Sequence, residues 1–178
     1  MRVVITPHCE EWPAQLLAVR TQLTAAFAPV LVAIEHIGST SVPGFAAKPI
    51  IDILLGADSL ARVEHAIPRL AELGYDYVPK YEVQLPMRRY FVRAASPSSL
   101  KVHLHCAVED TDFWHEHIAF RDALRGNSVL LKQYQDLKVN LAASLDDFHA
   151  YTDAKAPFIE AALSSMRPKA RREGKFLT

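Results

Sequence analysis

Apolar positions divide the chain into an N-terminal part with strand patterns and a C-terminal part with helical patterns. Apolar residues recur at helical spacing over about Glu10–Phe27, which predicts a first helix. Val30–Ile34 is a continuous apolar run, which predicts a strand buried on both faces. Ile50–Leu55 predicts a second buried strand that contains a single charge. Residues 38–49 between them are rich in glycine and proline and predict a turn-rich connection.

The following segment predicts a helix and then three strands. Asp58 and Ser59 resemble an N-terminal cap for a helix over residues 60–73, which Gly74 would end. The predicted strands cover residues 75–79, 88–93 and 101–108, with a hairpin turn at 96–99 between the last two.

Helical patterns fill the rest of the chain. Residues 112–166 predict three helices, and residues 167–178 predict a frayed basic tail. The fold class expected is therefore α+β or α/β, with a mixed sheet flanked by helices. We expect one domain over residues 1–178, with a sheet core over about 28–110 and a helical half over about 112–166.

Composition narrows the classes of function. The 178 residues are 50% hydrophobic and 22% charged, which is typical of a globular domain. The formal net charge is zero, so no global field recruits nucleic acid or an anionic membrane. Cys9 and Cys106 are too few for a disulfide framework and are expected to be reduced thiols. Because no apolar run is long enough for a signal peptide or membrane span, we expect a cytoplasmic protein.

Gly38-Ser39-Thr40 follows the first predicted strand. A tight turn there can present backbone N–H groups and hydroxyls to a phosphate, and glycine lets the backbone approach a ligand closely. The alternative is a plain turn that ends the strand.

Asp52 is a lone carboxylate inside an apolar strand. An unpaired buried carboxylate costs several kcal/mol, so a metal ion, Lys48, an arginine or N–H groups must compensate it. A structural ion pair would do so as well. Twelve residues separate Ser39 from Asp52, which predicts a phosphate-type turn and a carboxylate on adjacent strands.

His103 and His105 share one face of their predicted strand, because side chains alternate along a strand. Two imidazoles at this spacing can bind a metal or a phosphate, or exchange protons, or they can be surface residues of a half-solvated sheet. The preceding strand carries Arg88, Arg89 and Arg93, which suit an anionic ligand or acidic neighbours.

The helical half contains three polar pairs one turn apart. These are Arg121 with Arg125, Tyr134 with Lys138, and Tyr151 with Lys155. Such pairs either line a ligand site or belong to solvated helix faces.

Together these residues resemble the GrpB (UPF0157) family over about residues 12–159. The resemblance is carried by residues 35–44 and 46–53, by His103-Leu104-His105, and by the polar pairs of the helical half. Similar segments are found behind dephospho-coenzyme A kinase in some bacteria.

The family is similar to the nucleotidyltransferase superfamily, whose signature is a Gly-Ser turn followed by Asp-x-Asp on the next strand. Here Gly38-Ser39 matches the turn and Asp52 the first aspartate, whereas Leu54 stands in the place of the second. The resemblance implies a divalent metal (Mg²⁺, Mn²⁺ or Zn²⁺) and a nucleoside triphosphate substrate. One aspartate with two imidazoles would favour Zn²⁺ or Mn²⁺.

The implied catalytic and metal-binding residues are Asp52, His103 and His105. The implied phosphate- or nucleotide-binding residues are Gly38, Ser39, Thr40, Lys48, Arg89, Arg121, Tyr134, Lys138 and Lys155.

Three functions remain open at this point. The first is metal-dependent nucleotidyl or phosphoryl transfer to a small acceptor. The second is a non-catalytic module that binds a nucleotide or a coenzyme A-like phosphate, which the leucine at position 54 favours. The third and weakest is an RNA-binding or scaffold protein that uses Arg121, Arg125 and the basic tail. The acceptor, the nucleotide, the metal and the oligomeric state are left open.

Overall fold

Five strands form one mixed sheet in the order β1-β2-β5-β4-β3. The computed structural model describes residues 5–30, 32–145 and 147–166. The strands are β1 (Ala33–Ile37), β2 (Ile50–Ala57), β3 (Tyr75–Tyr77), β4 (Arg88–Arg93) and β5 (Lys101–Val108). β2 and β5 run parallel and the other neighbouring pairs run antiparallel, which confirms the predicted mixed sheet.

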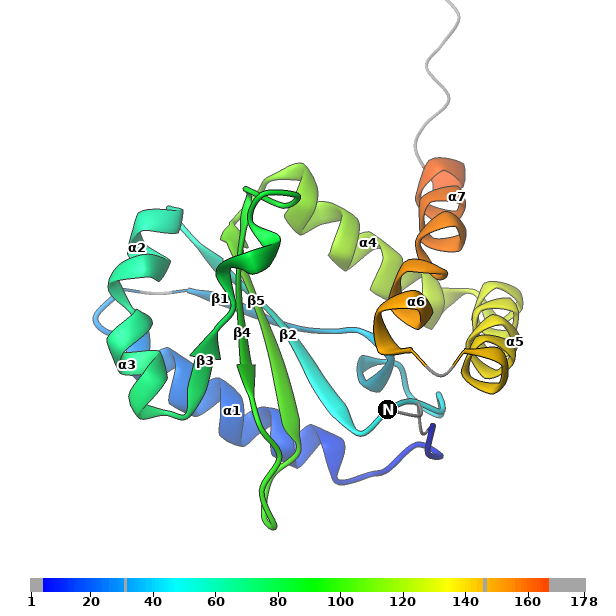
Figure 1. Cartoon of the computed structure of the whole chain (residues 1–178), viewed down its shortest axis with the longest axis horizontal. Coiled ribbons are helices and arrows are strands. Elements are labelled where there is room, and N and C mark those ends of the chain that lie inside the picture. The colour runs from blue at the N-terminus through cyan, green and yellow to red at the C-terminus, as the bar shows by residue number, and fades with distance from the viewer. Residues whose placement is uncertain (1–4, 31, 146, 167–178) are drawn as a thin grey trace, which may run out of the picture.

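Helices cover both faces of this sheet (Figure 1). One face carries α1 (Trp12–Phe27), α2 (Leu60–His65) and α3 (Ile67–Glu72). The other carries α4 (Asp112–Gly126), α5 (Ser128–Ser144), α6 (Phe148–Asp153) and α7 (Ala156–Met166). Two 3₁₀ turns, η1 (Ser39–Ser41) and η2 (Pro79–Tyr81), follow β1 and β3. The predicted helical C-terminal half is confirmed.

The main core lies between the sheet and α1 to α3. Ile51, Ile53 and Leu55 of β2 point into it and are fully buried. Because side chains alternate along a strand, the residues between them face the other way, toward α4 to α7. That face receives Asp52 from β2 and, through the pairing of Asp52 with His103, the two histidines of β5.

The first strand differs from its prediction. It begins at Ala33 rather than Val30, and it lies at the edge of the sheet, where only Ile34 and Ile37 are buried. The hydrophobic run located the strand approximately but did not predict how it pairs with its neighbour. Antiparallel pairing with β2 sets its register and joins Ile37 to Asp52.

The other differences from the prediction concern where helices begin and end. The helix predicted over residues 60–73 is divided at Ala66, two residues before Pro68, which has no N–H for helical hydrogen bonding. In the C-terminal half the described residues form four helices rather than three. Leu145 is extended after α5, and the Asp147 carboxylate then caps α6 by accepting a hydrogen bond from the N–H of Ala150.

Several local predictions are confirmed. β4 and β5 have the predicted bounds, and Ser96 and Ser99 pair in the hairpin turn between them. Ser59 caps α2, and Gly74 has a φ of +82° after α3. Both cysteines are free. Within the described ranges, no helix has the length and hydrophobicity needed to span a bilayer. The predicted basic tail lies outside the described residues.

Candidate functional site

A cavity of about 400 Å³ lies on the α4-to-α7 side of the sheet. Its walls come from the turn after β1, from strands β2, β4 and β5, and from helices α5 and α6. Eight of the predicted site residues line it: Ser39, Thr40, Lys48, Asp52, His103, His105, Lys138 and Lys155. Residues up to 116 positions apart in the chain, from Ser39 to Lys155, therefore meet in one place.

The turn after β1 is held by hydrogen bonds of its own side chains. The Ser41 hydroxyl donates to the carbonyl oxygen of Gly38 at 2.6 Å, and the Thr40 hydroxyl donates to that of Ile50 at 2.9 Å. Thr40 Oγ1 also lies 3.0 Å from His36 Nε2. Because Thr40 has one hydroxyl hydrogen, which goes to Ile50, the imidazole is the donor in that contact. Burial lowers the pKa of His36 to about 4, so this ring is neutral.

Gly38 makes room for Asp52 rather than lining the cavity. Its φ is +69°, a conformation that favours glycine. A β-carbon on residue 38 would lie 2.3 Å from Oδ2 of Asp52. Glycine at this position therefore sets the close approach of turn and carboxylate.

Asp52 pairs with His103 across neighbouring parallel strands. Asp52 Oδ1 lies 3.2 Å from His103 Nδ1, and the two residues are direct partners in the ladder. In the tautomer whose Nδ1 hydrogen is directed at the carboxylate, Nε2 of the imidazole can act as a proton acceptor. The pair can thus accept a proton from a ligand hydroxyl in the cavity.

His105 does not join this pair as a third metal ligand. Its Nδ1 lies 3.1 Å from Nη1 of Arg88, and a guanidinium can only donate. Burial and the Arg88 charge hold the pKa of His105 well below its usual value. Among the described residues, no three His, Cys, Asp or Glu side chains are grouped to hold a metal ion. The predicted Asp52-His103-His105 ligand set is therefore not assembled, because an arginine occupies the side of His105.

Three lysines converge on the cavity from different elements. Lys48 precedes β2, Lys138 lies on α5 and Lys155 follows α6. Burial and mutual repulsion lower the pKa of Lys48 to about 8 and that of Lys138 to about 7. The pKa of Lys155 is lowered as well, chiefly by burial.

Lys138 is the least exposed of the three lysines. Its side chain is 3% exposed, and Nζ donates to Ser39 Oγ at 2.9 Å and to the carbonyl oxygen of Ala46 at 3.0 Å. Nζ also lies 4.1 Å from the centre of the Phe45 ring. The lysine thus ties α5 to the Gly38–Ser41 turn.

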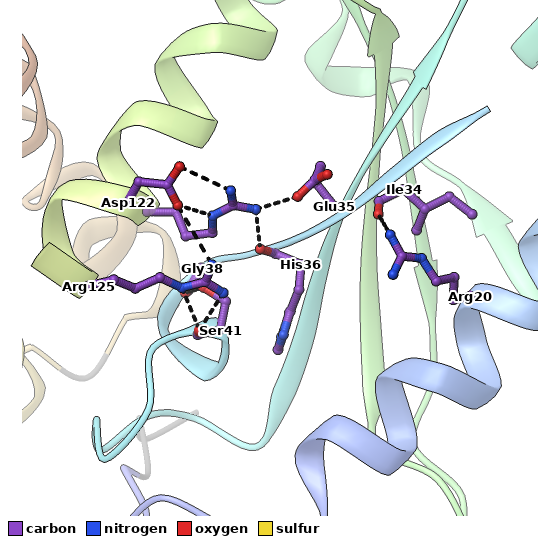
Figure 2. A network of polar contacts seen from close by, with 9 residues as sticks. Arg20, Ile34, Glu35, His36, Gly38, Ser41, Asp122 and Arg125 are labelled. Carbon is purple, nitrogen blue, oxygen red and sulfur yellow. Dashed lines mark hydrogen bonds and ion pairs between the residues drawn. The ribbon is translucent and has the colours of Figure 1, made fainter.

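Arg125 of α4 holds this turn, as Figure 2 shows, and Arg121 of the same helix binds the strand before it. Arg125 donates twice to the carbonyl oxygen of Ser41, at 3.1 and 2.8 Å. Arg121, which is 9% exposed, binds Glu35 and Asp122 and the carbonyl oxygen of His36. Arg121, predicted to bind phosphate, does not line the cavity, because its donors are directed at the Glu35 and Asp122 carboxylates and the His36 carbonyl.

Arg89 and Tyr134 are also displaced from the site. Arg89 pairs with Cys106, so it lies on the opposite face of the sheet from the histidines and binds Glu64 and Glu82. Tyr134 is buried in an aromatic cluster with Phe45 and other rings. Neither lines the cavity.

Three further residues complete the cavity: Arg88, whose strand was expected to suit an anion, Tyr151 of a predicted polar pair, and Tyr90, for which the sequence contains no signal. Arg88 and Tyr90 enter it because Tyr90 is the ladder partner of His105 and Arg88 lies two positions away. The Arg88 guanidinium carbon lies 4.9 Å from the centre of the Tyr90 ring. Tyr151 of α6 places its ring 4.0 Å from Lys48 Nζ and 4.7 Å from Lys155 Nζ. The i, i+4 spacing of Tyr151 and Lys155 was the one sequence signal for that residue.

Comparisons with known proteins agree with this architecture. A crystal structure of the conserved protein GrpB from Enterococcus faecalis superposes with a TM-score of 0.79 at 31% identity, over 91% of this chain and 96% of that one. The glutamate-rich protein GrpB of Alkalihalophilus pseudofirmus is 36% identical over 92% of this chain and 95% of its own. A dephospho-CoA kinase of Mycolicibacterium paratuberculosis is 26% identical over 90% of this chain and 45% of its own length.

The molecule is an α/β protein with a lysine-rich cavity over a mixed sheet. It belongs to the GrpB family, whose model matches residues 2–165.

Proposed function

We propose that the cavity binds a small molecule through a di- or triphosphate group. The observation that supports this is the convergence of Lys48, Lys138 and Lys155 on one cavity that also contains the hydroxyl of Ser39. Burial lowers the pKa of all three lysines, and the positive charge of Lys155 lowers those of Lys48 and Lys138 further, so a bound polyanion would offset both effects. Phosphate oxygens accept charge-assisted hydrogen bonds from such groups.

The ligand we favour is a nucleoside triphosphate. A coenzyme A-like phosphate is the alternative, which the name of the mycobacterial relative supports. We place this binding in the cytoplasm, where free thiols such as Cys9 persist.

The donor atoms at the cavity fit a divalent metal only when the ligand contributes. Mg²⁺ is commonly held by one or two carboxylates together with substrate phosphates, and Asp52 is suited to that arrangement. The imidazole of His103, next to Asp52, would make Mn²⁺ or Zn²⁺ acceptable as well. When bound, such an ion would neutralise charge on the phosphate oxygens.

Calorimetry with inorganic triphosphate and with ATP, GTP, CTP and UTP, each with Mg²⁺ or Mn²⁺, tests the proposal. We expect binding of triphosphate and of at least one nucleotide. Lys155→Gln should weaken it roughly ten- to a hundredfold, the loss of a charge-assisted hydrogen bond. Lys132→Gln is the matched control, because this lysine is 76% exposed and pairs with Asp136 on α5. Absence of heat with every ligand, or equal effects of the two substitutions, would refute the proposal.

A second candidate function is nucleotidyl or phosphoryl transfer to a small acceptor, which the Asp52–His103 pair favours. The acceptor oxygen would form a bond to phosphorus as the bond to the leaving phosphate oxygen breaks, and the acceptor proton would pass to His103 Nε2. Incubation with triphosphates labelled at the α or γ position, in a mixture of small hydroxyl compounds, tests this step. Label that appears in a product with wild type and not with His103→Asn would support transfer. Binding of triphosphate without any labelled product would indicate that the protein binds the ligand without catalysing transfer.

A further inference from the structure

The Ser39 hydroxyl and the Lys138 amine form a pair at the wall of the cavity. Nζ and Oγ are 2.9 Å apart, although the residues are 99 positions apart in the chain. Ser39 is the first residue of η1, is half-buried and lines the cavity. As a phosphate-binding residue, Ser39 would act only as a hydrogen-bond donor. That role does not require the contact of its hydroxyl with the buried Lys138.

The surroundings hold the lysine amine in position and favour its unprotonated form. The carbonyl oxygen of Ala46 and the ring of Phe45 fix Nζ on two further sides. The charged groups that bear on it are Lys155 and Lys48, which repel an ammonium, and Asp52, which attracts one. Burial adds the largest effect, and the pKa of Lys138 falls to about 7. A lysine of this kind can act as a general base, whereas a solvated lysine cannot at neutral pH.

We propose that Ser39 is a nucleophile toward phosphorus and that Lys138 is its general base. Serine with a lysine base is an established alternative to serine with histidine. The inference rests on the proposed phosphate site, because the same cavity must present the phosphorus atom to Ser39.

The step balances within the cavity. Ser39 Oγ forms a bond to phosphorus, and the bond between phosphorus and the leaving oxygen breaks with its electron pair. When Nζ of Lys138 is unprotonated, its contact with Oγ reverses, so that the hydroxyl donates to the amine; the proton passes to Nζ, which can then donate it to the leaving oxygen. Lys48 and Lys155 lie where they would offset negative charge on the phosphoryl oxygens. The product is a phosphoseryl enzyme, which water or an acceptor hydroxyl would resolve.

Labelling of the full chain with an alkyl fluorophosphonate tests the pair directly. Attack by a serine hydroxyl forms the Ser–O–P bond and expels fluoride, so the chain gains one phosphonyl group. We expect peptide mapping by mass spectrometry to place that group on Ser39 and not on Ser41 of the same turn. Ser39→Ala should abolish it. Lack of labelling at Ser39 overturns the proposal.

Lys138→Arg distinguishes a base from a mere charge, since arginine keeps the charge but takes up no proton. We expect it to slow labelling roughly a hundredfold or more, the usual contribution of a general base. Lys132→Arg, on the solvent side of the same helix, should leave the rate unchanged. Equal rates in the two variants overturn the assignment of Lys138.

Thermal unfolding shows whether Lys138→Arg folds. If it does not, the pH dependence of the labelling rate in the wild type tests whether Lys138 is the base. Labelling should be slow at pH 5 and rise as the lysine loses its proton near pH 7. A rate that does not change over this range overturns the role of the lysine.

Inorganic triphosphate separates this inference from the proposed function. Protection of Ser39 from the label by triphosphate supports both. Triphosphate binding without any labelling refutes the role of Ser39 as a nucleophile but still supports the phosphate site. Labelling without triphosphate binding refutes the phosphate site but still supports the activation of Ser39 by Lys138.

Discussion

Gly38 and Asp52 occupy adjoining space at the centre of the site. A β-carbon on residue 38 would lie 2.3 Å from Asp52 Oδ2 and 2.9 Å from the Cβ of Asp52. The antiparallel pairing of Ile37 with Asp52 brings the two together, because the turn begins one residue after that pair. The turn therefore reaches this geometry only with a residue that has no side chain.

Replacement of Gly38 by alanine should destabilise the fold by about 2–3 kcal/mol, since it combines a strained φ with a steric clash. Gly44→Ala is the matched control, because Gly44 has a φ of +71° but a β-carbon on it would meet no atom within 4 Å. Urea unfolding of both variants measures the difference. Equal losses would show that Asp52 can move away at little cost.

Arg121 should contribute more to stability than an exposed cation. Its side chain is 10% exposed and binds Glu35, Asp122 and the carbonyl oxygen of His36. We expect Arg121→Gln to lower the free energy of unfolding by about 2 kcal/mol, because glutamine cannot replace the charged hydrogen bonds of the nearly buried guanidinium. Lys132→Gln, which removes a surface ion pair, should cost less than about 1 kcal/mol. Chemical denaturation that gave similar values for both would contradict the structural role of Arg121.

His36 should make stability depend on pH on the acid side. Its pKa is lowered by burial from 6.5 to about 4 in the folded chain, so the unfolded chain binds more protons between these values. Stability is complete above about pH 6.5 and falls as the pH decreases toward 4. The histidine contributes about 3 kcal/mol at most to that loss. His36→Gln should flatten this part of the profile in unfolding experiments across that pH range, and an unchanged slope would argue against a neutral His36 in the folded chain.

Asp52→Asn should have opposite effects on triphosphate binding with and without metal. Without a divalent ion, loss of the carboxylate removes repulsion of phosphate, so affinity should rise severalfold. With Mg²⁺ present, the carboxylate is a candidate ligand, so affinity should fall. Asp136→Asn, at an exposed position of α5, should change neither. Calorimetry that showed the same direction of change in both conditions would exclude Asp52 as a metal ligand.

Local features of the site could be predicted because they depend on neighbouring residues in the chain. His103 and His105 share a face by strand alternation alone. The glycine-containing turn and the aspartate of the next strand were placed on adjacent strands from their short separation, and the ladder confirms it. The Ser59 cap and the Gly74 stop likewise depend on local backbone chemistry.

The face on which a residue of β4 lies could not be predicted, because no local signal in the sequence sets the register of that strand. Arg88 and Arg89 are adjacent and chemically identical, yet one lines the cavity and the other binds glutamates on the opposite face. The pairing of Tyr90 with His105 places Arg88 on the face of the histidines and Arg89 on the opposite face. A shift of one residue in that pairing would exchange the two arginines.

The sequence by itself determined the family, the mixed sheet with its helical half, and the turn and aspartate at the centre of the site, because each follows from local pattern or short-range spacing. Only the tertiary structure decided which cations meet there. Packing of α5 on α4 brings Lys138 to Ser39, and the segment after α6 brings Lys155 to the same cavity. Packing of the helices also turns Arg121 toward Glu35 and buries Tyr134 among aromatic rings. The physical reason is that helix packing depends on the summed contacts of whole faces, which no single residue or spacing specifies.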